Sequence, residues 1–224
     1  MMNKLRFMFA MALAATLSLG TAMAQDLSSQ RGESQDLGEI LGHKVDHGGL
    51  VINPTPQHLY TLRSLPLDIT KGVALKGKEA KAFSSEVNFV KQSCKGAKLT
   101  INYVKGGWSA DDEMPNKSGS YALTVHHREG ITIKAYDELG AFYALQTLRQ
   151  IVESETAADG TIPALVIRDW PELKYRGVVE GFYGTPWSHE TRLSLIDFYG
   201  RFKMNYYIYG PKDDPYHSSP YWRE

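Results

Sequence analysis

Alternating apolar and polar residues predict strands in the middle of the chain. The alternation runs through residues 99–103, 121–125 and 131–135, and a period of two places successive side chains on opposite faces of a sheet. The last two segments are separated by a short polar stretch that ends in Gly130. We expect a hairpin here, in which Gly130 supplies the unusual backbone angle of the turn. Shorter apolar runs at residues 59–62 and 65–69 predict two further strands.

A helical period appears at residues 138–153 and, less regularly, at residues 79–92. In the first segment apolar side chains recur at three- and four-residue steps, and Asp137 stands at the N-cap position. We expect its apolar face to lie on the sheet and its opposite face to be in solvent. The apolar face comprises Leu139, Phe142, Leu145, Leu148 and Val152, and the opposite face comprises Gln146, Arg149 and Gln150.

These strands and helices indicate a small α+β domain, an open sheet with helices on one side, at about residues 50–166. Residues 162–171 contain two prolines and follow Gly160, which is typical of a boundary. We therefore expect them to form a link into a second domain.

The C-terminal part has a different pattern. Residues 177–180 are short, apolar and β-branched, as in a strand buried on both faces. Ser188 is placed to cap a helix that continues through Ile196 and Tyr199, and residues 204–209 form a second apolar run. Strand, helix and strand in this order make one crossover unit of a parallel sheet.

The N-terminus has the pattern of a secretory signal peptide. Lys4 and Arg6 precede an uncharged apolar stretch that ends in Ala22-Met23-Ala24. The stretch is shorter than the roughly 20 apolar residues that a spanning helix needs. We expect export to the periplasm or the exterior after cleavage before Gln25. Residues 25–47 are polar and predict a poorly ordered leader.

Charge and cysteine content narrow the possible partners. Basic and acidic residues both number 25, so the formal net charge is zero, and no dense basic stripe suggests nucleic acid. Cys94 is the single cysteine, which excludes an internal disulfide and a thiolate cluster. We expect it to be a small buried residue rather than a reactive thiol.

His126 and His127 are adjacent in the sequence. Neighbours on a strand point to opposite faces, so we predict no metal site there.

Polar and aromatic residues follow both C-terminal strands. In a barrel of eight strand–helix units the active site is built from the loops after the strands. Aromatic rings cover the C–H groups of a sugar, while lysine and aspartate hydrogen-bond its hydroxyls. The alternative is that the tyrosines pack in a core or an interface, and composition does not separate the two. The residues concerned are Gly181, Phe182, Tyr183 and Trp187 after the first strand, and Lys212, Asp213, Asp214, Tyr216 and His217 after the second.

Two parts of the sequence resemble known families. Residues 130–150 resemble the non-catalytic domain that precedes the barrel in β-hexosaminidases and related glycosidases, which implies a scaffold role. Gly177-Val-Val-Glu-Gly181-Phe-Tyr-Gly-Thr-Pro-Trp187-Ser and Tyr209-Gly-Pro-Lys212-Asp-Asp-Pro-Tyr-His217 resemble the opening motifs of family 84 glycoside hydrolases. This family comprises β-N-acetylglucosaminidases, including O-GlcNAcase and bacterial enzymes called hyaluronidases.

The family 84 resemblance implies hydrolysis of terminal β-linked N-acetylglucosamine from a glycan or glycoprotein. The implied mechanism is retaining, and the substrate's own 2-acetamido oxygen attacks the anomeric carbon. One carboxylate orients the acetamide and its neighbour acts as acid and then base; neither a metal nor an organic cofactor is implied. The matching substrate-binding positions are the backbone of Gly181, the ammonium of Lys212 and the side chain of Tyr183.

The catalytic acid pair is expected beyond Glu224. Asp213 and Asp214 are adjacent but belong to the second-strand motif, so we expect them to shape a loop. A complete barrel takes about 250 residues, and we expect a chain that ends at Glu224 to carry only its start and to be inactive alone. Two alternatives stay open: a family 20 hexosaminidase, and an exported glycan-binding or vestigial protein without catalysis.

The predicted organisation therefore has four parts. Residues 1–24 are a signal peptide, residues 25–47 a polar leader, and residues 48–170 a hexosaminidase-like α+β accessory domain. Residues 171–224 are the first β-α-β portion of an incomplete (β/α)8 TIM barrel.

Overall fold

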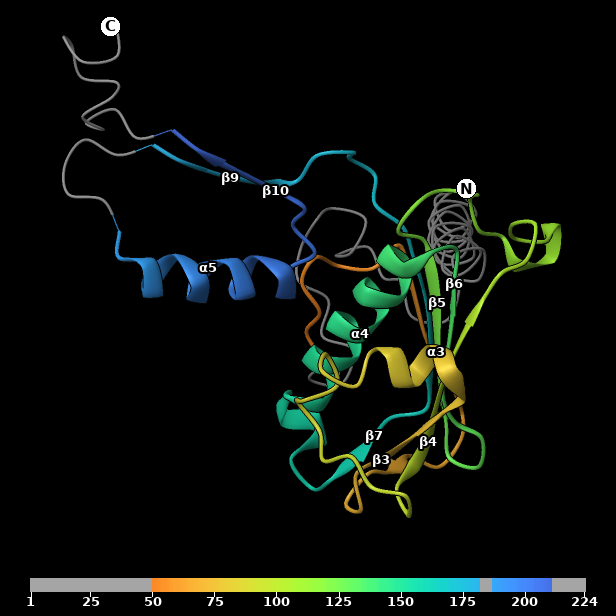
Figure 1. Ribbon diagram of the computed structural model, residues 1–224. Helices are drawn as coiled ribbons and strands as arrows, with labels where there is room; N and C mark the ends of the chain where they lie inside the picture. The colour runs from red at the N-terminus through yellow and green to blue at the C-terminus, as the bar shows by residue number, and fades with distance from the viewer. Residues whose placement is uncertain (1–49, 182–186, 211–224) are drawn as a thin grey trace, which may run out of the picture.

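A computed structural model describes residues 50–181 and 187–210 (Figure 1). The predicted signal peptide (residues 1–24) and polar leader (residues 25–47) lie outside the described residues.

A six-stranded mixed sheet forms the centre of the first domain, in the order β1-β8-β5-β6-β4-β3. The strands β1, β8, β5 and β6 run antiparallel to their neighbours, whereas β6, β4 and β3 are parallel. In this order their bounds are His58–Thr61, Leu165–Asp169, Tyr121–His126, Gly130–Ala135, Ala97–Tyr103 and Val73–Lys76. A two-stranded sheet of β2 (Leu67–Asp68) and β7 (Thr161–Ile162) lies beside it.

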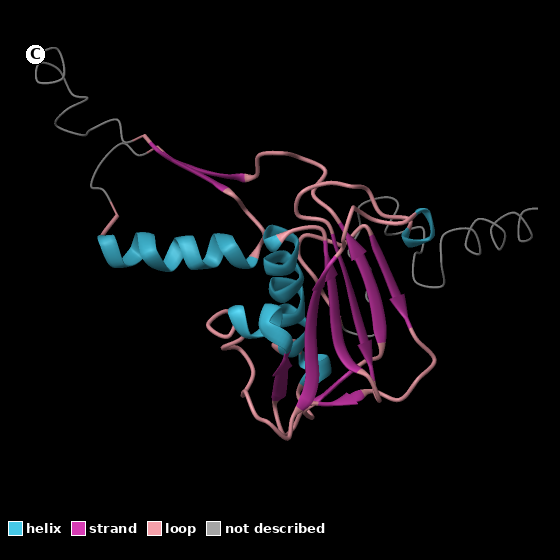
Figure 2. Ribbon diagram, turned by 45° about the vertical axis from the view of Figure 1, so that its right-hand side comes forward, coloured by secondary structure: helices cyan, strands magenta, loops and turns pink. Residues whose placement is uncertain are grey.

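Helices cover one face of the six-stranded sheet (Figure 2). The long helix α4 (Glu138–Val152) and the short helix α3 (Gly77–Ala82) lie on that face, and two single-turn helices occupy Ala110–Asp112 and Glu155–Ala157. Alternate strand residues such as Leu99, Leu123 and Ile133 are fully buried. The predicted α+β arrangement, an open sheet with helices on one side, is confirmed.

The predicted hairpin and helix cap are also confirmed. Strands β5 and β6 pair antiparallel, with His126 opposite Gly130. Gly130 has a φ of +85°, and an added Cβ would lie 2.2 Å from the carbonyl oxygen of Lys98. Both the backbone angle and the lack of space therefore favour glycine. The Asp137 carboxylate accepts the backbone N–H of Gly140 at 2.9 Å and thereby caps α4.

The helix predicted at residues 79–92 is wrong beyond Ala82, where α3 ends. The following chain runs beside β3: the Val73 N–H donates to the Lys91 carbonyl and the Ser93 N–H to the Val73 carbonyl. The apolar spacing that suggested a helix comes instead from turns that bury Val87. The expectation of a buried Cys94 is wrong as well, because the thiol is exposed in the turn before β4.

The predicted faces of α4 need correction. Leu139 is 37% exposed, whereas Gln146, expected in solvent, is 6% exposed. Gln150 joins segments that are distant in sequence, since its amide bonds both the N–H and the carbonyl of Asn53 and also the carbonyl of Arg201. The helix is buried on more than one stripe because α5 contacts it as well.

Residues 162–171 are not a link, because they contain β8, which lies between β1 and β5 inside the sheet. The alternation of buried Leu165, Ile167 and Asp169 is the strand signal that the flanking prolines obscured. The chain leaves the first domain only after Asp169.

The predicted strand–helix–strand unit is present and projects to one side of the first domain (Figure 1). It consists of β9 (Gly177–Glu180), α5 (His189–Arg201) and β10 (Tyr206–Tyr209). Ser188 caps α5 by accepting the N–H of Thr191 at 3.1 Å. Strands β9 and β10 are parallel, with Gly177 opposite Tyr206 and Glu180 opposite Tyr209.

Candidate functional site

The C-terminal ends of β9 and β10 meet at one edge because the two strands are parallel. Glu180 ends β9, Tyr209 ends β10, and the Gly210 N–H donates to the Glu180 carbonyl at 3.0 Å. Gly181 and Gly210, which directly follow the two strands, therefore lie at the same edge.

The buried carboxylate of Glu180 binds residues of β10 and α5 at this edge. Glu180 is 1% exposed, and the Arg192 Nε donates to both of its carboxylate oxygens, at 3.1 and 3.0 Å, while the Nη2 donates at 2.9 Å. The Tyr207 hydroxyl from β10 donates to the same carboxylate. One side chain thus joins both strands to α5.

The same cluster holds the arginine in its charged form. The hydrogen bonds that Arg192 donates to the Glu180 carboxylate raise the pKa of Arg192 above its usual value, and the guanidinium lies 4.7 Å from the centre of the Tyr209 ring. Sequence reasoning missed this pair. The signal was an acid at the end of an otherwise apolar strand, with an arginine in the following helix.

Gly181 follows directly and is exposed. An added Cβ would have as its nearest neighbours the Gly210 carbonyl oxygen at 3.8 Å and a Val179 methyl at 4.0 Å, which are ordinary contacts. Among the described residues, therefore, nothing in the packing or the backbone angle at this position demands glycine.

Tyr183 and Lys212, the other two predicted contacts with substrate, lie outside the described residues. Asp213 and Asp214 lie outside them as well. Trp187, which precedes α5, is 40% exposed. Of the three predicted substrate-binding positions, the structure thus describes Gly181 alone.

The strand–helix–strand unit exposes much apolar surface. Val179 is 62% exposed, Leu193 55% and Ile196 50%, and none of the described residues of α5 is buried. The expectation that β9 is buried on both faces is therefore wrong for the described part of the chain, in which only β10 pairs with it.

A buried polar cluster attaches the unit to the first domain. The Lys203 ammonium donates to the Asp169 carboxylate at 2.7 Å and to the Tyr121 hydroxyl at 2.9 Å, and that hydroxyl also donates to the carboxylate at 2.9 Å. Burial lowers the pKa of Lys203, against the opposing effect of Asp169, and burial raises the pKa of Tyr121 well above its usual value.

Arg176 makes a second connection at the same junction. Its guanidinium donates to the Tyr143 hydroxyl at 2.6 Å and to the Lys203 carbonyl at 2.9 Å. A cavity of about 240 Å³ lies beside these groups, lined in part by Trp170 and Leu173. Sequence reasoning found none of these contacts, because a lysine and an arginine in polar segments do not signal burial.

The described ranges lack the usual signals of a metal cluster and of a membrane span. Residues 50–181 and 187–210 contain no group of three or more histidine, cysteine, aspartate or glutamate side chains that could hold a metal. The rings of His126 and His127 lie 4.6 Å apart, since His127 belongs to the turn and the strand alternation does not apply to it. Across the same ranges no helix is both long and apolar enough to cross a bilayer.

Two family models match the chain, one after the other. The model described as glycosyl hydrolase family 20, domain 2 matches residues 50–170, more than half of the chain. The model described as beta-N-acetylglucosaminidase matches residues 176–224. The α+β domain and the strand–helix–strand unit are thus glycoside hydrolase domains. The chain belongs to the glycosyl hydrolase family 20, domain 2 family.

Known relatives are sugar hydrolases. The chain is 30% identical to N,N'-diacetylchitobiase of Vibrio harveyi over 158 residues, which is 68% of this chain and 17% of that protein. It is 50% identical to Protein O-GlcNAcase of Rattus norvegicus over 48 residues, 21% of this chain and 5% of that protein. The chain thus spans less than a fifth of either protein.

A solved structure is similar to this chain as well. The chain is similar to the structure of CpGH84B, with a TM-score of 0.59 and 32% identity, covering 78% of this chain and 32% of that chain. The relatives therefore support the mixed α+β fold and a connection with β-N-acetylglucosaminidases.

Proposed function

We propose that this chain supplies the N-terminal part of a family 84 β-N-acetylglucosaminidase. The reaction is hydrolysis of terminal β-linked N-acetylglucosamine from a glycan or glycoprotein by substrate-assisted retaining catalysis. The observation that carries the proposal is the β9–α5–β10 unit. It places Gly181 at the C-terminal edge of a parallel strand pair, within the segment that matches the beta-N-acetylglucosaminidase model.

In this proposal β9, α5 and β10 are the first unit of a (β/α)8 barrel. The apolar surface of Val179, Leu193 and Ile196 supports it, because in a barrel the neighbouring strands and helices cover such surface. Further units and the catalytic acid pair come from residues beyond Glu224. The chain alone is then inactive.

The substrate-binding roles in this proposal are those that the family 84 resemblance implies. The Gly181 backbone approaches the sugar closely, which explains a glycine that its own packing does not require. The Lys212 ammonium donates hydrogen bonds to sugar hydroxyls, and Tyr183 lines the pocket. Glu180 and Arg192 position this edge rather than touching substrate. No step needs a metal or an organic cofactor.

The proposal includes export. The signal-peptide pattern at residues 1–24 places the enzyme in the periplasm or outside the cell, where its partner is a glycan or glycoprotein that contains N-acetylglucosamine.

The test compares the chain with the complete product of its reading frame, using an aryl β-N-acetylglucosaminide. We expect the complete product, but not the chain, to hydrolyse this substrate, and the anomeric configuration to be retained. Replacing the 2-acetamido group by 2-trifluoroacetamido should slow hydrolysis strongly, because the attacking oxygen becomes less basic. Inversion of configuration, or activity of the chain alone that is lost on Asp214→Asn, would overturn the proposal.

A family 20 hexosaminidase is the second candidate. The match of residues 50–170 to the family 20 domain and the similarity to N,N'-diacetylchitobiase favour it. An Asp-Glu pair on a later strand would support family 20, whereas an Asp-Asp pair would support family 84. Binding to immobilised N-acetylglucosamine without hydrolysis by the complete product would instead support a glycan-binding protein.

A further inference from the structure

Positive charge is concentrated in one segment of a chain that is neutral overall. Residues 71–105 contain eight lysines and two glutamates, with no arginine, aspartate or histidine, so their net charge is +6 while that of the whole chain is zero. The lysines are spread along the sequence, and for that reason no basic run was evident in it. The fold brings them to one domain.

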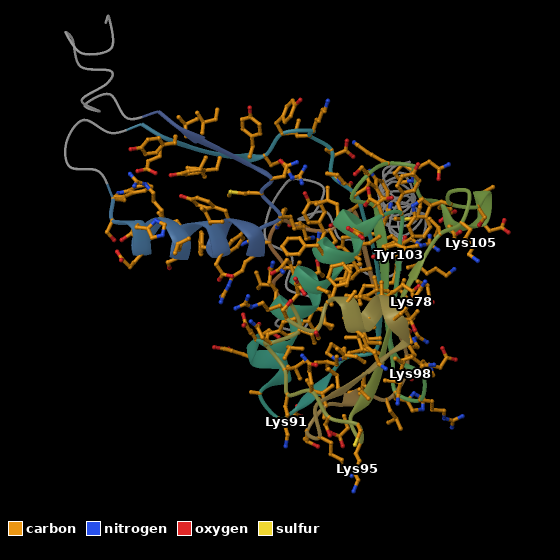
Figure 3. All side chains as sticks on the ribbon, in the orientation of Figure 1. Lys78, Lys91, Lys95, Lys98, Tyr103 and Lys105 are labelled. Carbon is orange, nitrogen blue, oxygen red and sulfur yellow. The ribbon has the colours of Figure 1, made fainter. Side chains whose placement is uncertain are left out.

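All eight lysines are exposed. Figure 3 shows Lys78 and Lys98 on the right of the first domain and Lys91 and Lys95 at its lower end, away from Lys105. Within the described residues Lys78 alone of the eight has a salt bridge, to Glu79 at 3.9 Å. The positive charge of this surface is therefore largely uncompensated by acids of the described chain.

The end of this surface near Tyr103 is less positive. Burial first, and then the carboxylates of Glu138, Glu79 and Asp137, raise the pKa of the Tyr103 hydroxyl. The other end of the surface lies around β3 and the chain that follows α3.

A groove lies at that end. Its volume is about 470 Å³, and it is lined by Val73–Lys76 of the edge strand β3, by Lys81 and Ser84, and by Gln92, Ser93 and Cys94. Ligand sites commonly measure about 300–1,000 Å³. Lys76 and Lys81 therefore bring two ammonium groups to a hollow that also offers hydroxyl groups.

We propose that this groove binds an acidic sugar residue of a polyanionic glycan. The ammonium groups of Lys76 and Lys81 pair with its carboxylate or sulfate, and Ser84 and Ser93 hydrogen-bond its hydroxyls. Lys91, Lys95 and Lys98 hold the charges of neighbouring sugars. This site belongs to the accessory domain, so it goes beyond the hydrolytic function proposed above and does not depend on it.

The lining favours a glycan over a nucleic acid. Single-stranded nucleic acids are held by aromatic side chains on which bases stack, and none of the described residues that line the groove is aromatic.

Calorimetry on the full chain tests the site with a chondroitin sulfate octasaccharide as the probe. Lys76→Gln/Lys81→Gln should weaken binding by about tenfold or more, since each loses a direct charge contact, whereas Lys71→Gln/Lys105→Gln should weaken it by less than about threefold. The control pair removes the same charge from the same segment but lies outside the groove. A neutral N-acetylglucosamine oligomer of equal length should not bind.

Cys94 provides a second readout, because it lines the groove and is the only cysteine in the chain. The octasaccharide should slow alkylation of Cys94 by iodoacetamide in the unchanged chain and not in Lys76→Gln/Lys81→Gln. Equal weakening by both double variants, absence of protection, or equal protection by free sulfate would overturn the proposal. So would tighter binding and stronger protection by single-stranded DNA of equal charge.

Discussion

Breaking the buried contact between Lys203 and Asp169 should unfold the chain more easily, and the two partners should contribute unequally. Lys203 is 4% exposed and Asp169 8%. Asp169→Asn leaves the ammonium buried with the Tyr121 hydroxyl but without its counter-ion, which typically costs about 3–5 kcal/mol.

Lys203→Met should cost less, because the carboxylate keeps other donors. Asp169 still accepts the N–H of Trp170 at 3.0 Å, the N–H of Gln57 at 3.3 Å and the Tyr121 hydroxyl at 2.9 Å. Methionine also fills the space of the lysine stem. We therefore expect a loss of about 1.5–3 kcal/mol, the range for one hydrogen bond to a charged group.

Urea unfolding followed by circular dichroism measures both values, and the double variant gives the coupling between the two side chains. Arg168→Met is the control. Its ion pair with Glu113, whose side chain is 75% exposed, should contribute at most about 1 kcal/mol. Equal losses for the two buried variants, or a greater loss for Lys203→Met, would refute the reasoning.

Three further predictions concern other parts of the molecule. Gly130→Ala should destabilise the chain by about 1 kcal/mol or more beyond Gly106→Ala, because both have positive φ but only Gly130 faces a close backbone oxygen; equal thermal shifts would contradict this. Burial, and then the charge of Arg168, lower the pKa of His58 below 6.5, so the free energy of unfolding should fall as the pH decreases through the window below 6.5. An NMR titration locates that window, and His58→Gln should reduce the pH dependence; a titration midpoint above 6.5 would count against it. Glu180→Gln should speed amide exchange in the β9–β10 pair by about tenfold or more, since charge-assisted bonds contribute about 1.5–3 kcal/mol, and unchanged exchange would contradict a positioning role.

Local patterns predicted much of the fold. The alternation in β4, β5 and β6 and the Asp137 cap of α4 were readable, because each is dictated by neighbours in sequence. The failures have a common cause. Residues 83–92 and β8 take their conformation from pairing with distant strands, and that pairing overrides local spacing and flanking prolines.

The candidate site was readable only in part for the same reason. Parallel pairing of β9 with β10 follows from the strand–helix–strand pattern, and with it the position of Gly181. Burial of Glu180 and Lys203 does not follow, because charged residues are almost never fully buried unless paired, and the partners come from other elements. Only the fold shows which charged residues pair with each other.

The environment of Glu180 bears on where the catalytic acids must come from. A general acid has to lie within hydrogen-bond reach of the reacting atoms, but this carboxylate is 1% exposed and is occupied by Arg192 and the Tyr207 hydroxyl. Because it is buried and paired with a guanidinium, it lacks the access that this role needs. Glu180 therefore fixes the edge of the strand pair from which Gly181 projects. The proposed mechanism consequently requires a carboxylate pair from another part of the enzyme.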